Sequence, residues 1–135
     1  CLMSCKSSKV AFDPTSTKKE YFSFGSGGGF TGKVIKYYLT KDGILYTKDG
    51  EDIKKAGMAP KAIVNQLFQN FTGLGLDKIE LNDPGNKYSF IESQSKGTTY
   101  KLQWGKNPLE NKNVETFYSI LMDVVKKINL SSQKS

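Results

Sequence analysis

Two turn sequences, each lying between segments of strand-forming residues, constrain the fold of this chain most strongly. Lys41-Asp42-Gly43 separates residues 33–40 from residues 44–47, and both flanking segments are rich in β-branched and aromatic side chains. Ser95-Lys96-Gly97 separates residues 88–92 from residues 99–104 in the same way. A short glycine-containing turn between two such segments is typical of a β-hairpin. The sequence therefore predicts two hairpins, and alternating apolar residues over 99–104 indicate that the second has one buried face.

One further strand and two helices complete the expected order of elements. Residues 20–24 predict an aromatic-rich strand, and the glycines over 25–29 predict a loop after it. After Pro60, apolar residues recur at helical spacing, and Gly73 is the expected stop. These residues are Ile63, Val64, Leu67, Phe68 and Phe71. A second amphipathic helix is expected over 114–128, with Asn113 as its N-cap.

This order, βββ-α-ββ-α, predicts an α+β fold. Because the strands cluster in hairpins, we expect a mainly antiparallel sheet of about five strands with both helices packed on one face. The length of 135 residues fits one domain with one core. The sequence divides into a flexible N-terminal tail over 1–19, a single domain over 20–130, and a frayed C-terminus over 131–135.

The first five residues, Cys1-Leu2-Met3-Ser4-Cys5, carry both cysteines of the chain. Leu2-Met3-Ser4-Cys5 resembles a bacterial lipobox, in which the cysteine is acylated and becomes the first residue of the mature lipoprotein. The resemblance implies Cys5 as the lipidation site, with Cys1 as the alternative. A local disulfide between the two is a third interpretation. The polar residues that follow suit a tether, so we expect a location at the bacterial cell envelope, with the membrane as a partner through an N-terminal acyl anchor.

Composition excludes several classes of function. The chain has no histidine and no arginine, so neither a Ser-His-Asp nor a Cys-His centre can be built from it. Its 20 basic residues are all lysines, dispersed along the sequence, with a net charge of +7. Recognition of DNA and RNA relies on arginine, so we expect a solvated basic surface and no nucleic-acid partner. We expect no enzyme, no metal and no cofactor. A hydrolase using carboxylates alone is the minor alternative, and the carboxylates at 49, 51 and 52 are typical of a solvated turn.

The glycine-rich run over 27–34 matches three nucleotide-binding patterns. Two of them, the dinucleotide fingerprint and the P-loop, require a helix directly after the glycines, whereas a strand is expected here. The third, the kinase glycine loop, requires an H-R-D segment that a chain without His and Arg cannot contain. A tight turn is the plain interpretation. The alternative is a partner-binding loop formed by Gly27, Gly28, Gly29, Phe30, Thr31 and Gly32, in which Phe30 either enters a groove of the partner or folds back onto the sheet.

The same run carries a family resemblance. Residues 26–32, Ser-Gly-Gly-Gly-Phe-Thr-Gly, begin a hairpin that is followed by a helix, a hairpin with Tyr88 and Phe90, and a last amphipathic helix. This arrangement, over about residues 21–128, is similar to emfourin, a family of small bacterial inhibitors of thermolysin-type zinc proteases. The chain departs from emfourins by an extra glycine, a lipid-type N-terminus and the lack of arginine. It also resembles envelope lipoproteins of Bacteroidetes-type bacteria. The emfourin resemblance implies that loop 25–32, with turn 41–43, contacts a secreted or envelope protease.

Two functional hypotheses follow. The first is a membrane-tethered lipoprotein that acts as a protein-binding module, with metalloprotease inhibition through the glycine-rich loop as its specific form. The second is an envelope lipoprotein that binds a small molecule or glycan by stacking on aromatic side chains. The residues considered for stacking are Tyr37, Tyr38, Tyr46 and Trp104, and at strand spacing such residues more often belong to a core.

Overall fold

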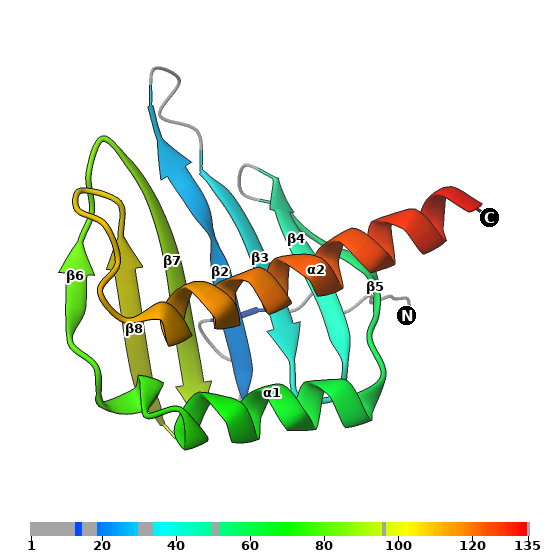
Figure 1. Ribbon diagram of the computed structural model, residues 1–135. Coiled ribbons are helices and arrows are strands. Elements are labelled where there is room, and N and C mark those ends of the chain that lie inside the picture. Colours follow the sequence, from blue (N-terminus) through cyan, green and yellow to red (C-terminus); the bar gives the residue numbers. More distant parts are fainter. Residues whose placement is uncertain (1–12, 15–18, 30–33, 50–51, 96, 135) are drawn as a thin grey trace.

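The computed structural model describes residues 13–14, 19–29, 34–49, 52–95 and 97–134, and within them seven strands form one sheet with two helices on one face (Figure 1). The strands are β2 (Tyr21–Gly28), β3 (Ile35–Thr40), β4 (Ile44–Asp49), β5 (Asp52–Met58), β6 (Leu81–Asp83), β7 (Lys87–Ser95) and β8 (Thr98–Trp104). The helices are α1 (Lys61–Gly73) and α2 (Lys112–Lys134), and a short 3-10 helix, Leu76–Lys78, follows α1. The predicted α+β class and two-helix arrangement are therefore confirmed at this coarse level.

The strand order is β5-β4-β3-β2-β7-β8-β6. All neighbouring strands are antiparallel except β6, which pairs parallel with β8. Both predicted hairpins are present, and in the first the Gly43 N–H donates to the Thr40 carbonyl at 2.9 Å. Strand β2, the first of the chain, lies at the centre of the sheet between β3 and β7. The chain before β2 therefore meets the sheet at its centre and not at an edge.

The main core lies between the sheet and the two helices. On this helix-covered face, Phe22 and Phe24 of β2 are completely buried. The centroid of the Phe22 ring lies 4.2 Å from that of the Phe68 ring in α1 and 5.4 Å from that of the Phe117 ring in α2. Burial of one such side chain contributes about 1.5–3 kcal/mol, so this aromatic cluster attaches both helices to the sheet. On the opposite face, which we call the helix-free face because no described helix packs on it, Tyr21 and Tyr38 form a smaller cluster.

The expected five strands were too few. Strand β5 was missed because its sequence, Asp-Ile-Lys-Lys-Ala-Gly-Met, shows the charged, interrupted pattern of an edge strand. Strand β6 was missed because residues 82–86 have turn chemistry, and the three residues of β6 are extended only through their pairing with β8. The loop predicted over 25–29 was also wrong, since β2 continues to Gly28, paired with β3 as far as Ser26 and with β7 as far as Gly28.

The helix ends differ from expectation as well. Helix α2 begins at Lys112, and its cap is Asn111 rather than Asn113, because the Asn111 side-chain oxygen accepts the Asn113 N–H at 2.9 Å. The backbone of α2 is helical as far as Lys134, six residues beyond the end expected at residue 128, while residue 135 lies outside the described part. In α1, Ile63 is exposed although the spacing placed it on the apolar face.

Candidate functional site

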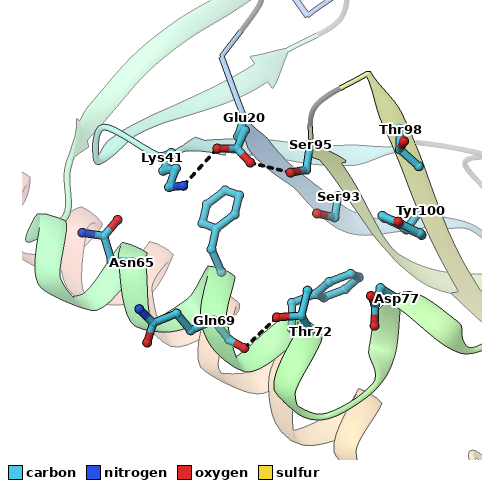
Figure 2. A pocket seen from close by; sticks show the side chains of 12 residues that line it. Glu20, Lys41, Asn65, Gln69, Thr72, Asp77, Ser93, Ser95, Thr98 and Tyr100 are labelled. Carbon is cyan, nitrogen blue, oxygen red and sulfur yellow. Dashed lines mark hydrogen bonds and ion pairs between the residues drawn. The ribbon is translucent and has the colours of Figure 1, made fainter.

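A cleft of about 540 Å³ lies between α1 and the sheet, at the end where β2 begins and β7 ends (Figure 2). We call it the α1 cleft. Its volume falls in the range of small-molecule sites, roughly 300–1,000 Å³. Residues from four separate parts of the chain line it. They are Glu20, Lys41, Asn65, Phe68, Gln69, Phe71, Thr72, Asp77, Ser93, Ser95, Thr98 and Tyr100.

Aromatic rings form the apolar part of the α1 cleft. Phe68 and Phe71 project from α1 because they continue its apolar stripe beyond the deeply buried Val64 and Leu67. Tyr100 of β8 stands beside them, with its ring 6.3 Å from that of Phe71. Phe68 and Tyr100 are only partly buried, so they offer apolar surface to a ligand.

Hydroxyl groups line the sheet side of the α1 cleft. Ser93 and Ser95 of β7 and Thr98 of β8 point to the helix-covered face, and Figure 2 shows the Ser93 and Ser95 hydroxyls directed toward the cleft. Ser93 is only 3% exposed and lies opposite Phe22 in the strand register, in the middle of apolar neighbours. A buried hydroxyl in such a place is unfavourable unless it has a hydrogen-bond partner. Packing alone would favour an apolar residue at position 93.

Charged residues close one side of the cleft. The Glu20 carboxylate accepts a hydrogen bond from the Ser95 hydroxyl. It also forms an ion pair with Lys41, whose ammonium nitrogen lies 3.0 Å from a carboxylate oxygen. The backbone also joins Glu20 to Lys41, because the Lys41 N–H donates to the Glu20 carbonyl at 2.9 Å. The residue directly before β2 and the turn after β3 are therefore fixed together at the cleft wall.

A second ion pair lies next to this wall. Lys19 contacts Asp42 at 2.9 Å, and the Thr40 hydroxyl also donates to the Asp42 carboxylate. Burial alone would raise the pKa of Asp42, but the hydrogen bonds from Thr40 and Lys19 together hold that pKa below its ordinary value. The hydrogen bond to Asp42 raises the pKa of Lys19 in turn. Both groups are partly exposed, so their attraction is screened by water.

Asp77, in the 3-10 helix after α1, contributes a carboxylate to the far wall. One of its oxygens, Oδ1, is buried without a hydrogen-bond partner among the described residues. Such an oxygen is an acceptor that lacks a donor. Together with the hydroxyls of the sheet and the amides of Asn65 and Gln69, it makes the cleft a surface that both donates and accepts hydrogen bonds beside aromatic rings.

The opposite end of β2, which we call the glycine-rich end, carries three of the six residues expected to bind a partner. Gly27 and Gly28 belong to β2 and pair with Tyr88 and Lys87 of β7, and the Gly29 N–H donates to the Asn86 carbonyl at 2.8 Å. Phe30, Thr31 and Gly32 lie outside the described residues. The structure thus places the first three in or next to a paired strand rather than in a separate loop.

Close packing of backbone explains much of the glycine content here. A Cβ on Gly28 would lie 1.9 Å from the Asn86 carbonyl oxygen, and the residue has a φ of +90°. A Cβ on Gly25 would lie 1.9 Å from the Ile35 carbonyl oxygen. The fold therefore requires glycine at both positions.

A hollow of about 490 Å³ lies at this end beside Trp104, and Val34 and Ile35 are each 46% exposed there.

The four aromatic residues considered for glycan stacking are not brought together. Tyr37 and Trp104 pack into the core on the helix-covered face, whereas Tyr38 and Tyr46 belong to the cluster on the helix-free face. Tyr38 and Trp104 are buried. These four residues do not form one exposed platform, and the exposed aromatic surface of the α1 cleft comes from Phe68 and Tyr100 instead.

The remaining expectations concern the acidic cluster and the N-terminus. Asp49 and Asp52 pair across the β4–β5 turn, Glu51 lies outside the described part, and no described group of His, Cys, Asp or Glu is arranged to hold a metal ion. Cys1 and Cys5 also lie outside the described residues. None of the described helices is both long and apolar enough to span a membrane.

Sequence reasoning missed the α1 cleft. The one available signal was a pair of serines, Ser93 and Ser95. Strand alternation places both on the same face of the sheet as the buried Ile91.

Comparison with known proteins adds no assignment. The chain matches no protein-family model, and no curated protein is significantly similar to it.

Proposed function

We propose that this chain is a non-catalytic binding module, tethered to a bacterial envelope by an acylated Cys5 or Cys1, and that its α1 cleft binds a small polyhydroxylated ligand of the carbohydrate class. Sugars present hydroxyls that donate and accept hydrogen bonds and C–H faces that pack on aromatic rings. The cleft offers both kinds of surface: Ser93, Asp77 and Glu20 supply polar groups, and Phe68 and Tyr100 supply aromatic rings.

The observation that carries this proposal is the buried polar lining. Ser93 is 3% exposed among apolar neighbours, and Asp77 Oδ1 is buried without a partner among the described residues. The unpartnered Asp77 oxygen does not help the protein to fold, because a buried polar group without a hydrogen bond is destabilising. A ligand hydroxyl would supply a donor to the Asp77 carboxylate and could also bond the Ser93 hydroxyl in the same cleft.

Titration of the full chain with N-acetylglucosamine, galactose, maltose and chitobiose tests the proposal. We expect at least one to bind, and Ser93→Val to weaken its affinity about three- to tenfold, since one hydrogen bond contributes about 0.5–1.5 kcal/mol. Ser89→Val is the matched control, because Ser89 lies on the same strand and the same face but at the glycine-rich end. Failure of all four sugars to bind would reject the ligand class. Equal weakening by both variants would reject the location.

The second candidate is contact with another protein through the glycine-rich end, with inhibition of a thermolysin-type protease as its specific form. The exposed Val34 and Ile35, which follow Thr31 after two further residues, favour it. Inhibition of such a protease by the full chain should be weakened by Phe30→Ala combined with Thr31→Ala, and should be unchanged by Ser93→Val. An inhibition constant that does not respond to the double variant would remove this role from the glycine-rich end.

The proposed anchor is testable separately. Intact-mass analysis of the protein purified from its own bacterial membranes should show acyl chains on an N-terminal cysteine. A mature chain that begins at Cys5 would assign the lipobox-like segment as the signal, and one that begins at Cys1 would assign the alternative. An unmodified N-terminus in membrane extracts would reject the anchor while leaving the α1 cleft proposal untouched.

A further inference from the structure

Lysines that are dispersed in the sequence meet on the helix-free face of the sheet. Strand alternation directs Lys36 of β3, Lys48 of β4, Lys55 of β5 and Lys101 of β8 to this face. The side chain of Lys36 confirms this direction, because its ammonium lies 5.3 Å from the Tyr38 ring and 5.7 Å from the Phe90 ring. Within the described strands, Glu92 is the one acidic side chain on this face. Four positive charges therefore oppose one negative charge.

The arrangement of these lysines is unfavourable for the isolated domain. Lys36 and Lys48 lie directly opposite each other on neighbouring strands, where like charges repel. Lys101 is paired with Glu92 only at 4.0 Å, and Lys48, Lys55 and Lys101 are exposed. An anionic surface on this side would offset the repulsion.

The chain that precedes β2 approaches from the same side. Tyr21 belongs to the helix-free face, and its hydroxyl donates to the Pro14 carbonyl at 3.4 Å. Pro14 lies only nine residues after Cys5 in the sequence. Even a fully extended chain of nine residues spans at most ~32 Å, so an acyl anchor at Cys5 would hold this face near a membrane.

We propose that the helix-free face docks on anionic lipid headgroups through Lys36, Lys48, Lys55 and Lys101. The two helices lie on the other side of the sheet (Figure 1), and residues of α1 and of that side of the sheet line the α1 cleft. Docking in this orientation directs the cleft away from the membrane, where a soluble ligand is available. The surface goes beyond ligand binding in the cleft and does not require it.

Binding of the unacylated full chain, kept reduced, to vesicles of phosphatidylcholine with about one-third phosphatidylglycerol tests the proposal. The variant is Lys48→Gln, Lys55→Gln and Lys101→Gln; Lys36 is kept because it packs on Tyr38 and Phe90. The control is Lys112→Gln, Lys126→Gln and Lys127→Gln, which removes the same charge from α2. Each lysine near an anionic membrane contributes about a fivefold change in affinity.

We expect the face variant to bind at least about tenfold more weakly than the parent chain and the α2 variant to stay within about twofold. Binding should also fall steeply as salt is raised. Equal losses in the two variants, or equal binding to pure phosphatidylcholine vesicles, would overturn the proposal. Binding to heparin or DNA with the same lysine dependence, but not to the anionic vesicles, would overturn it in favour of a soluble polyanion.

Discussion

The regions at the two ends of strand β2 both contain unusual residues, but for different reasons. At the glycine-rich end, Gly25 and Gly28 are required because neighbouring carbonyl oxygens occupy the space of a side chain. At the cleft end, Ser93 is a buried hydroxyl among apolar neighbours, and Asp77 has a buried oxygen without a hydrogen-bond partner among the described residues. An unusual residue that the fold fully explains gives no information about function, whereas one that the fold does not explain points to a ligand. The cleft end is therefore where we propose the ligand site.

The largest expected effect is a loss of stability from a substitution at the glycine-rich end. Gly28→Ala should lower the free energy of unfolding by about 2–4 kcal/mol, because it combines a left-handed backbone conformation with a clash against the Asn86 carbonyl. Gly97→Ala is the matched control. Gly97 also has a positive φ, +80°, but nothing lies within 4 Å of its missing Cβ, so a loss of only about 1–2 kcal/mol is expected. Equal losses in urea unfolding would contradict the close-approach explanation.

A smaller effect of opposite sign is expected at the cleft end. Ser93→Val replaces a buried hydroxyl by an apolar, strand-favouring side chain, so it should raise the free energy of unfolding by about 0.5–1 kcal/mol. The same variant should bind sugars more weakly. Thermal unfolding of the variant measured beside its affinity would show both changes. A variant that is less stable than the parent would mean that the Ser93 hydroxyl serves the fold.

The smallest expected effect concerns pH at the cleft wall. Because the folded-state pKa of Asp42 lies below its ordinary 3.8, its stabilising contribution is present above that pH and is lost as pH falls through the folded value. The contribution of Lys19, whose pKa is raised above 10.5, is present below that pH and is lost as pH rises further. Asp42→Asn should remove both dependences and cost about 0.5 kcal/mol or less at neutral pH, since both groups are partly exposed. The free energy of unfolding would be measured for parent and variant from pH 3 to pH 7. A difference between the two that does not change with pH would contradict this account.

The features that sequence predicted correctly are those fixed by local chemistry. The turns at 41–43 and 95–97, the inward alternation of Leu102 and Trp104, and the apolar stripe of α2 depend on neighbours in sequence, and all are present. Strand β6 and the extension of β2 through Gly28 were missed because both depend on partner strands. The α1 cleft was missed for the same reason. It joins Glu20, Lys41, residues 65–77 and residues 93–100, and Ser93 stands out only when the burial of its neighbours is known.

Mapping of backbone amide shifts by NMR tests the central claim most directly, because it reports which end of the sheet responds to a ligand. The full chain, labelled with ¹⁵N, would be titrated with N-acetylglucosamine, galactose, maltose and chitobiose in turn. Our account predicts that, for at least one sugar, the shifted amides gather in residues 65–77 and 93–100 around the α1 cleft. Shifts gathered at residues 25–29 and 87–89 instead, or no shifts with any of the four sugars, would contradict it.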